Sequence, residues 1–158
     1  MAQATGTRTF KDAQIAISTN GTAWTDITGW HSQVNVTGGG RMTGEKYTGD
    51  SNYAVIGAGK TQPLKVEATI LYTEGATDPY PVLEAYKLAN PAQDIYVRAT
   101  PFGNVTAGTS RTKYTYAQGP ITDLLPPSGD MSKADPLEVK FTVMSPSYTT
   151  STSTTTTA

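Results

Sequence analysis

Residues 57–61, with the sequence GAGKT, come nearest to a motif that performs chemistry. Glycines followed by lysine and threonine end the phosphate-binding loop G-x-x-x-x-G-K-[ST], in which backbone N–H groups and the lysine hold the phosphates of a nucleotide. That loop needs its first glycine at position 54, where this chain has Ala54. The flanking sequence also lacks the pattern of a parallel βαβ unit. We therefore predict no nucleotide site here.

The other candidate residues lack the spacing of a catalytic or metal site. His31 is the sole histidine, and in a chain without cysteine it has too few partner ligands to form a zinc site. A Ser-His-Asp triad would have to use His31, but G-x-S-x-G is absent, and a lone histidine beside Trp30 favours a structural role. Asp123, Asp130 and Asp135 do not have the spacing of a calcium loop. The sequence predicts no catalytic residues, no cofactor and no enzymatic activity.

The composition limits what such a chain can be. With 158 residues, 37% of them hydrophobic, it matches one domain with a thin sandwich core. Twelve basic against thirteen acidic residues give a net charge of −1, without the basic excess of a nucleic-acid-binding protein. The lack of cysteine excludes disulfides and fits folding in a reducing cytoplasm. No signal peptide or bilayer-spanning segment is expected, because no long apolar run occurs.

Alternating apolar residues locate the first strands. Ile15 and Ile17 alternate with polar residues, and the alternation resumes after Asn20-Gly21. Asn-Gly between two such runs is the strongest short-range signal for a β-hairpin. Residues 33–37 predict a short, half-buried strand that ends at three glycines.

One helix-sized run lies between strand patterns. Residues 80–90 place Leu83 and Tyr86 at helical spacing, after prolines that the first helical turn tolerates. A helix of about ten residues is marginal alone, so this face must pack on a sheet. Further strand patterns lie at residues 64–72, 94–100, 113–117 and 137–144. The predicted fold is mostly β: a β-sandwich or open barrel of antiparallel strands with one short flanking α-helix, about residues 80–90, and extended N- and C-terminal arms.

Residues 38–62 interrupt the strand pattern with glycines, charges and aromatic residues. Such a long loop is uncommon in a compact domain and is usually functional or disordered. Tyrosine and arginine are enriched on surfaces that a partner buries. We predict an extended hairpin that gains its order from a neighbouring subunit, and a floppy surface loop is the alternative. Its candidate interface residues are Arg41, Glu45, Lys46, Tyr47, Asp50 and Tyr53.

Both ends of the sequence are predicted to be arms. Residues 1–12 are small and polar around Phe10, and residues 146–158 are almost entirely serine and threonine apart from Tyr148. Neither end can bury enough apolar surface to offset the entropy lost when its backbone is ordered. We expect adjacent subunits to order both arms, with Phe10 and Tyr148 at the interface and residues 13–145 as the single domain between them.

The order of these parts resembles the tail tube (major tail) proteins of long-tailed bacteriophages. The similarity covers most of residues 13–145 and rests on order rather than on any single diagnostic motif. Its parts are the hairpin and following turn at 15–30, the Gly-Glu-Lys-Tyr at 44–47, Gly59-Lys60 before the long strand, the passage 71–88 and the closing strand at 136–144.

The resemblance implies a function as well as a fold. It implies a β-sandwich flanked by a helix, with six copies in a ring and rings stacked into a hollow tube through which the viral genome passes. The loop and arms would bridge subunits and rings, other tail proteins would meet the tube ends, and the protein would reside in the virion tail. The threonine-rich tail departs from members that carry an extra Ig-like domain. Another ring-forming tail protein of similar fold is an open alternative.

A tube that conducts DNA must not bind it, so its channel should be neutral or acidic. The polar faces of two long predicted strands supply the candidates. The candidate lumen-facing residues are Glu67, Thr69, Glu138 and Thr142. Lys65 and Lys140 lie on the same strands and add positive charge, which complicates the prediction of a neutral or acidic face.

A carbohydrate- or receptor-binding β-sandwich, such as an adhesin or tail-tip module, is the alternative from another class. Its binding residues would be exposed aromatics. The candidates are Trp24, Trp30, Tyr47, Tyr53, Tyr114 and Tyr116. Such modules gather aromatic residues on one face built from loops. Here the aromatics Tyr72, Tyr96, Tyr114 and Tyr116 lie within predicted strands, so we prefer the tail tube protein as the interpretation.

Overall fold

The computed structural model describes residues 13–47, 54–101, 110–128 and 135–154. These residues form eleven strands and one helix. The elements are β1 (Gln14–Ser18), β2 (Thr25–Asp26), β3 (His31–Gly38), β4 (Arg41–Tyr47), β5 (Ala54–Thr61), β6 (Leu64–Leu71), α1 (Pro79–Leu88), β7 (Ile95–Thr100), β8 (Ser110–Gly119), β9 (Ile121–Leu124), β10 (Glu138–Ser145) and β11 (Tyr148–Thr154).

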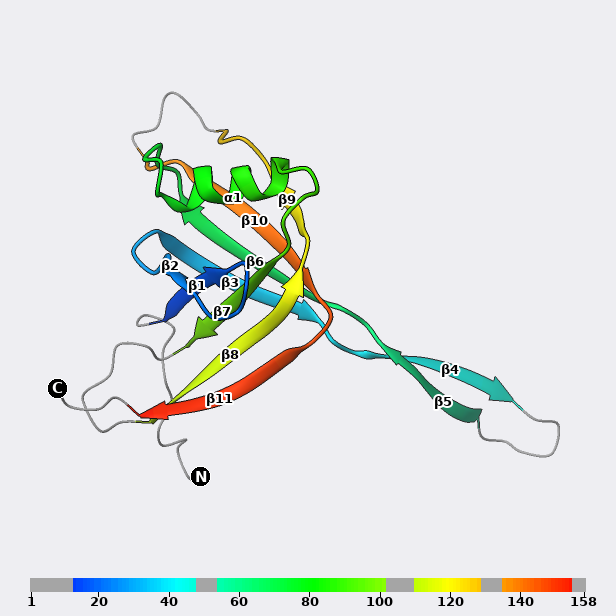
Figure 1. Ribbon diagram of the computed structural model, residues 1–158. Helices are drawn as coiled ribbons and strands as arrows, with labels where there is room; N and C mark the ends of the chain where they lie inside the picture. The colour runs from blue at the N-terminus through cyan, green and yellow to red at the C-terminus, as the bar shows by residue number, and fades with distance from the viewer. Residues whose placement is uncertain (1–12, 48–53, 102–109, 129–134, 155–158) are drawn as a thin grey trace.

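The strands form two larger sheets and a separate hairpin (Figure 1). One sheet has five strands in the order β11-β8-β7-β1-β2, and the other has four in the order β3-β6-β10-β9. β4 and β5 form a two-stranded sheet of their own. Every pairing among them is antiparallel. The prediction of a mostly β, antiparallel fold with one short helix is confirmed, and the described strands do not close into a barrel.

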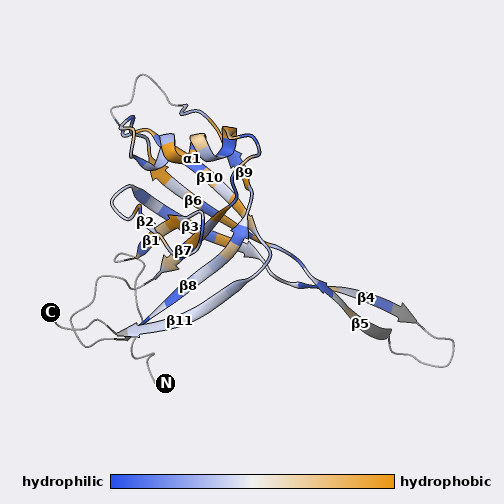
Figure 2. Ribbon diagram, viewed as in Figure 1, coloured by the Kyte–Doolittle hydropathy of each residue, from blue (hydrophilic) through white to orange (hydrophobic). Residues whose placement is uncertain are grey.

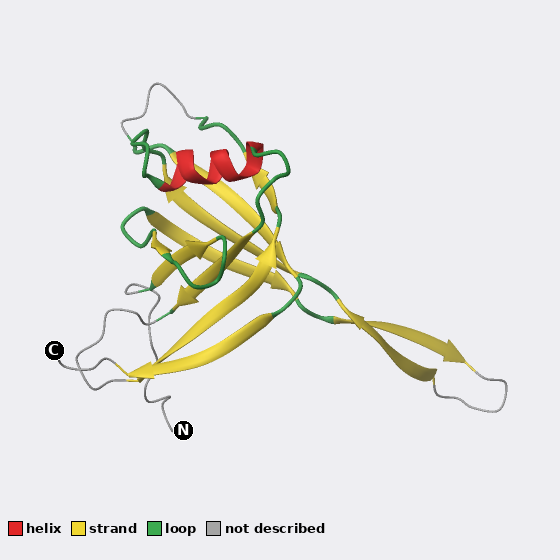
Figure 3. Cartoon of the chain, in the orientation of Figure 1, coloured by secondary structure: helices red, strands yellow, loops and turns green. Residues whose placement is uncertain are grey.

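The Asn20-Gly21 dipeptide does lie between two paired strands, as predicted. β1 and β2 pair through Ala16 with Asp26 and Ile17 with Thr25. The connection between them is wider than a two-residue turn and is drawn as a loop in Figure 3. The Asn20 side-chain oxygen accepts hydrogen bonds from the N–H groups of Thr22 and Ala23, both at 2.9 Å. Asparagine therefore organises this loop through its side chain.

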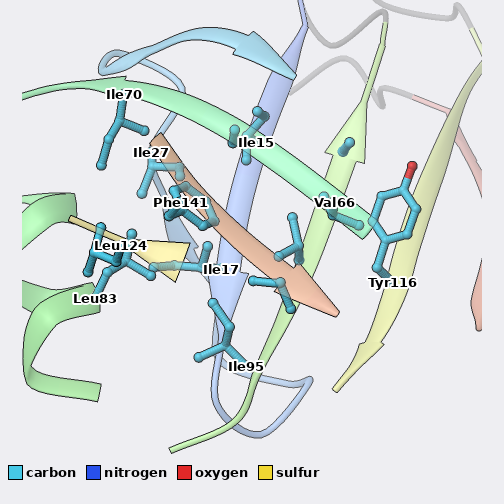
Figure 4. Close-up of a cluster of buried hydrophobic side chains, with 14 of the residues drawn as sticks. Ile15, Ile17, Ile27, Val66, Ile70, Leu83, Ile95, Tyr116, Leu124 and Phe141 are labelled. Atoms are coloured by element: carbon cyan, nitrogen blue, oxygen red, sulfur yellow. The ribbon is translucent and has the colours of Figure 1, made fainter. Parts of the chain in front are cut away.

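The core lies between the two larger sheets and follows the predicted alternation. On β6, every second residue from Leu64 to Ile70 is buried. β7 and β1 supply the facing residues, and Phe141 of β10 has no exposed surface (Figure 4). Hydrophobic residues concentrate in β1, β6, β7 and β10, whereas β11 is pale along its length (Figure 2). One sandwich core therefore holds both sheets.

The two sheets join where β8 leads into β9 and β10 leads into β11. The Ser145 hydroxyl donates to the carbonyl of Ala117 at 2.8 Å, and the Ala117 N–H donates to the carbonyl of Ser147 at 2.9 Å. A Cβ on Gly119 would lie 1.8 Å from the carbonyl oxygen of Met144. Only glycine allows the strands to approach this closely at the corner.

Helix α1 has the predicted position and the predicted buried face. Asp78 caps it in an extended conformation, and Pro79 and Pro81 lie in its first turn. Leu83 is fully buried and lies beside Leu124 of β9 (Figure 4). The Lys87 ammonium donates to the carbonyl of Leu124 at 2.7 Å. The helix thus packs on the four-stranded sheet through both apolar and polar contacts, and it is too short and too polar to cross a membrane.

Residues 148–154 form β11 in a segment for which the sequence predicts an arm ordered by a neighbour. β11 pairs with β8 in continuous register from Tyr148–Tyr116 to Thr154–Ser110. The hydrogen bonds of a strand ladder use backbone groups, so they need no apolar side chains, and threonine favours this conformation. The subunit itself therefore orders this part of the C-terminal region. Residues 1–12 and 155–158 lie outside the described residues.

Candidate assembly surfaces

The β4–β5 hairpin extends away from the sandwich, as Figure 1 shows. Its strands pair with each other from Arg41–Thr61 to Tyr47–Ala54, so the segment is a hairpin as predicted. The side chains of Arg41 and Glu45 are exposed. An isolated two-stranded hairpin is only marginally stable in water. Among the described strands, β4 and β5 pair only with each other and join neither of the two larger sheets.

The base of the hairpin is fixed by close backbone contacts. Gly38 and Gly39 have φ values of +87° and +74°, a region that glycine adopts without strain. A Cβ on Gly38 would lie 2.4 Å from the carbonyl oxygen of Pro63. The Gln62 N–H donates to the carbonyl of Gly40 at 2.8 Å. The direction in which the hairpin leaves the sandwich is thus set by the main chain.

The structure describes only part of the predicted hairpin interface. Lys46 and Tyr47 lie in β4, opposite Val55 and Ala54. Asp50 and Tyr53 lie in the segment 48–53, outside the described residues, as does Phe10 near the N-terminus.

Two of the predicted lumen residues lie on the outer face of the four-stranded sheet. Glu67 and Thr69 alternate with the buried residues of β6. The Glu67 carboxylate forms an ion pair with the Lys65 ammonium at 3.0 Å. The hydrogen bond from Lys65, reinforced by its charge, lowers the pKa of Glu67 below the ordinary value. The positive charge of Lys65 is therefore neutralised by Glu67 on the same strand.

The outer face of this sheet carries a slight excess of negative charge. Glu138 is exposed, and Lys140 lies two residues along β10, opposite Thr69. Asp123 of β9 lies beside them and is also exposed. On this face, the two positive charges of Lys65 and Lys140 are thus outnumbered by the three carboxylates of Glu67, Glu138 and Asp123. No cluster of unmatched basic residues lies on this part of the described surface.

Thr142 cannot line an open surface, because its side chain has no exposure. It lies opposite Glu67 of β6 on one side and Asp123 of β9 on the other. Both neighbours have longer side chains than threonine. The register of β9 also shifts between Thr142 and Val143, which breaks the regular alternation there. The prediction that Thr142 faces the lumen is therefore wrong. The alternation of residues placed Thr142 on the correct side of the strand, but its side chain is buried there.

An apolar groove opens beside the edge strands, and the sequence did not reveal it. Val36 of β3, Leu64, Tyr114, Tyr116 and Tyr148 line it. Tyr148 is 52% exposed, and its ring lies 6.2 Å from the rings of Tyr114 and Tyr116. The predicted interface residue Tyr148 therefore belongs to a cluster of three tyrosines. Pairing of β8 with β11 creates this cluster, and that pairing was not predicted.

A second surface missed by the sequence lies on the outer face of the five-stranded sheet. A cleft there is lined by three cationic residues, Arg98, Arg111 and Lys113, together with Trp24 and Asp26. The Arg98 guanidinium stacks over the Trp24 ring, 4.2 Å from its centre. Partial burial and the charges of Arg98 and Arg111 lower the pKa of Lys113. We call this surface the cationic cleft.

Residues 57–61 and His31, which the sequence analysis weighed as ligand-binding or catalytic candidates, lie in strands. Residues 57–61 lie within strand β5, not in a loop that precedes a helix. His31 begins β3, and its Nδ1 lies 2.8 Å from the carbonyl oxygen of Thr28. Among the described residues, no group of three or more His, Asp or Glu side chains is placed to hold a metal ion.

Comparison with known proteins gives matches of fold. No protein-family model matches the sequence, and no curated protein matches it significantly. A chain of the PVC sheath-tube complex, an extracellular contractile injection system in its extended state, matches with a TM-score of 0.68 at 14% identity, over 96% of this chain and 100% of its own. A chain of the anti-feeding prophage (AFP) tube terminating cap matches with a TM-score of 0.67 at 15% identity, over 97% of this chain and 95% of its own.

A chain of the AFP baseplate, solved with six-fold symmetrisation, matches with a TM-score of 0.61 at 11% identity, over 96% of this chain and 97% of its own. Identities this low establish the fold and nothing finer. Within that limit, they confirm the resemblance to tail tube proteins that the order of elements indicated. The chain has the fold found in sheath-tube, tube-cap and baseplate assemblies of contractile injection systems.

Proposed function

We propose that this protein is a structural tail subunit that assembles with copies of itself into stacked rings forming a tail tube. The observation that carries the proposal is the β4–β5 hairpin, which leaves the sandwich and, among the described strands, joins neither of the larger sheets. A hairpin of this kind gains stability when a neighbouring copy covers it. The fold shared with sheath-tube, cap and baseplate chains gives the proposal its context.

The proposed ring contains six copies. This number comes from the family resemblance, and the six-fold symmetrised AFP baseplate, which contains a chain of the same fold, agrees with it. The proposed contacts between copies use the hairpin, with Arg41, Glu45, Lys46 and Tyr47 in β4 and Asp50 and Tyr53 beyond it. Phe10 and Tyr148 are proposed as further contact residues, and Tyr148 already lies in an exposed apolar groove.

The outer face of the four-stranded sheet is the proposed lining of the channel. Glu67, Thr69 and Glu138 lie on this sheet, and its lysines are outnumbered by carboxylates. A weakly acidic lining repels DNA phosphates rather than trapping them, so DNA can pass without binding. In this role the protein folds in the host cytoplasm, resides in the virion tail and meets other tail proteins at the tube ends.

Electron microscopy of a hairpin deletion tests the proposal. Gly40 and Gln62 are already joined by a backbone hydrogen bond of 2.8 Å. An Asn-Gly turn can therefore replace residues 41–61 without moving the sandwich. We expect negative-stain images of the full chain to show rings or hollow tubes. The deletion variant should melt at the same temperature as the free full-length subunit and form neither.

Two results would count against the proposal. If the full chain remains a single subunit under all conditions of concentration and salt, the assembly function is wrong. If the deletion variant forms rings and tubes as readily as the full chain, self-assembly holds but the hairpin does not carry it.

A further inference from the structure

The tyrosines of β8 and β11 continue the core face of the five-stranded sheet. Tyr116 pairs with Val97 of β7 and with Tyr148 of β11, and Tyr114 pairs with Ala99 of β7. Directly paired residues of antiparallel strands lie on the same face of a sheet. Val97 and Ala99 are buried in the core, yet Tyr148 is 52% exposed. The core face of this sheet therefore extends beyond the cover of the other sheet, and its uncovered part forms the apolar groove.

An adjoining hollow of about 300 Å³ prolongs the apolar groove toward the end of β7. Its lining residues are Val34, Val36, Ala99, Pro101, Tyr114 and Tyr116. The hollow and the groove share Val36 and two of the tyrosines. The described lining contains no charged or amide side chain, whereas the hydroxyl groups of a sugar need several hydrogen-bond partners when they are buried. The space is therefore suited to one bulky apolar side chain.

The described chain begins beside this hollow. Gln14 of β1 pairs with Thr100 of β7, so the next residues along the two strands, Ala13 and Pro101, lie close together. Ala13 is only 3% exposed. β1, β7 and β8 are neighbours in that order, which places β8 roughly 10 Å from the start of β1. Three residues of extended chain span a similar distance of roughly 10 Å.

Phe10 lies three residues before Ala13 in the sequence and is the one aromatic residue of the segment 1–12. Its sequence neighbours Thr9 and Lys11 are polar. The segment therefore offers one bulky ring at the chain length that reaches the groove. Burial of such a ring against apolar side chains is favourable.

We propose that the apolar groove binds the N-terminal segment of its own chain, with the Phe10 side chain between Val36 of β3 and Tyr114 of β8. This inference goes beyond the proposed function, because the docking takes place in a free subunit. It also brings together two residues proposed to contact neighbouring copies. Phe10 in the groove lies on the same surface as Tyr148, so a neighbouring copy meets one apolar patch and not two separate residues.

The N-terminal segment is favoured over other parts of the same protein as the occupant. The β4–β5 hairpin of the same chain leaves the sandwich and extends away from it (Figure 1). A segment of another copy must first meet the groove by diffusion. The chain's own segment is attached at Ala13, next to the hollow, and therefore has a high effective concentration there.

Disulfide trapping tests the docking, because the chain contains no cysteine of its own. The test variant combines Thr9→Cys with Val36→Cys and keeps Phe10. Cysteine behaves as a small apolar residue, so the lining of the groove stays apolar. Dilute free subunits are oxidised with glutathione disulfide, and the disulfide within one chain is followed by mass spectrometry and by gel mobility without reductant. Docking should accelerate its formation, because it raises the effective concentration of the two thiols.

The matched control combines Thr9→Cys with Asn35→Cys. Asn35 is the adjacent residue of β3, is exposed, and lies opposite Glu67 on the outer face of the sheet. We expect the test variant to form its disulfide about tenfold faster than this control. Adding Phe10→Ala to the test variant should lower its rate to that of the control. Thermal melting checks that each variant folds, and Val34→Cys, in the same hollow, replaces Val36→Cys if the latter unfolds the subunit.

Three results would overturn the inference. Equal rates in the test variant and the control would show that the segment does not dock in the groove. A fast rate that survives Phe10→Ala would show that Phe10 is not the side chain that binds. If a mixture of the single variants Thr9→Cys and Val36→Cys links two copies as fast as the test variant closes on itself, the occupant belongs to another copy. None of these measurements needs a polymer, so failure of this inference and failure of the proposed function are separate results.

Discussion

The sandwich and the β4–β5 hairpin are both antiparallel β structure, yet they differ in what stabilises them. In the sandwich, Val66, Val97 and Phe141 have no exposed surface and lie between two sheets. In the hairpin, Arg41, Met42 and Glu45 are all exposed, and the two strands pair with each other and with no other described strand. Folding of the subunit should therefore depend on the first region and assembly on the second.

The largest expected effect comes from emptying the core at the helix. Leu83→Ala removes a fully buried side chain that packs α1 onto the sheet. We expect the free energy of unfolding to fall by about 2 to 5 kcal/mol, measured by urea denaturation. Leu88→Ala on the same helix is the matched control, because Leu88 is 73% exposed; its effect should stay within about 0.5 kcal/mol. Equal effects from the two would mean that α1 does not pack as described.

Glycine-to-alanine substitutions compare the two regions directly. Gly119→Ala places a methyl group 1.8 Å from the Met144 carbonyl oxygen, so the corner between the sheets must move. We expect a loss of about 1 to 3 kcal/mol in unfolding free energy. Gly44→Ala in β4 meets nothing within 4 Å and should leave the melting temperature unchanged. A Gly119→Ala protein as stable as the wild type would refute the close approach at the corner.

Tyr47→Ala should separate assembly from folding. Tyr47 lies near the end of β4, away from the core, and is proposed to contact a neighbouring subunit. We expect sedimentation velocity to show weaker polymerisation, while the melting temperature of the free subunit stays unchanged. Unfolding of the free subunit by this substitution would place Tyr47 in the core of the subunit and not at an interface.

The smallest expected effect concerns the ion pair on the outer face of the four-stranded sheet. The pKa of Glu67 is lowered by Lys65, so the pair contributes to stability above the ordinary glutamate pKa of about 4.5 and loses that contribution as the pH falls through the lowered value. Lys65→Met should raise the Glu67 pKa toward its ordinary value in an NMR titration. A Glu67 pKa that does not change in this variant would show that the ion pair is absent in solution.

Sequence patterns predict the sandwich well because burial repeats locally along each strand. The alternation from Leu64 to Ile70 and the helical spacing of Leu83 and Tyr86 both depend on residues that are close in the chain. The hairpin could be located for a related reason: its glycines and charges interrupt that repeat. The pairing of β11 with β8 could not be predicted, because its ladder uses backbone groups that every residue has.

The candidate surfaces were less predictable than the fold, because they combine distant segments. The cationic cleft brings Trp24 from the first hairpin against Arg98 of β7 and Lys113 of β8. No local spacing links these residues. The prediction that Thr142 is exposed failed for a similar reason. The side chains of the neighbouring strands determine whether a short side chain reaches solvent. Alternation predicts the face on which a residue lies, but cross-strand neighbours decide how open that face is.

Hydrogen exchange, measured residue by residue in free subunits and in assembled polymer, tests the central claim most directly. Core amides of β6, β7 and β10 should be protected in both states, because the sandwich is complete within one subunit. Amides of β4 and β5 should exchange rapidly in the free subunit and become protected in the polymer. If the hairpin amides exchange at the same rate in both states, a neighbouring copy does not stabilise the hairpin, and the proposed basis of assembly is wrong.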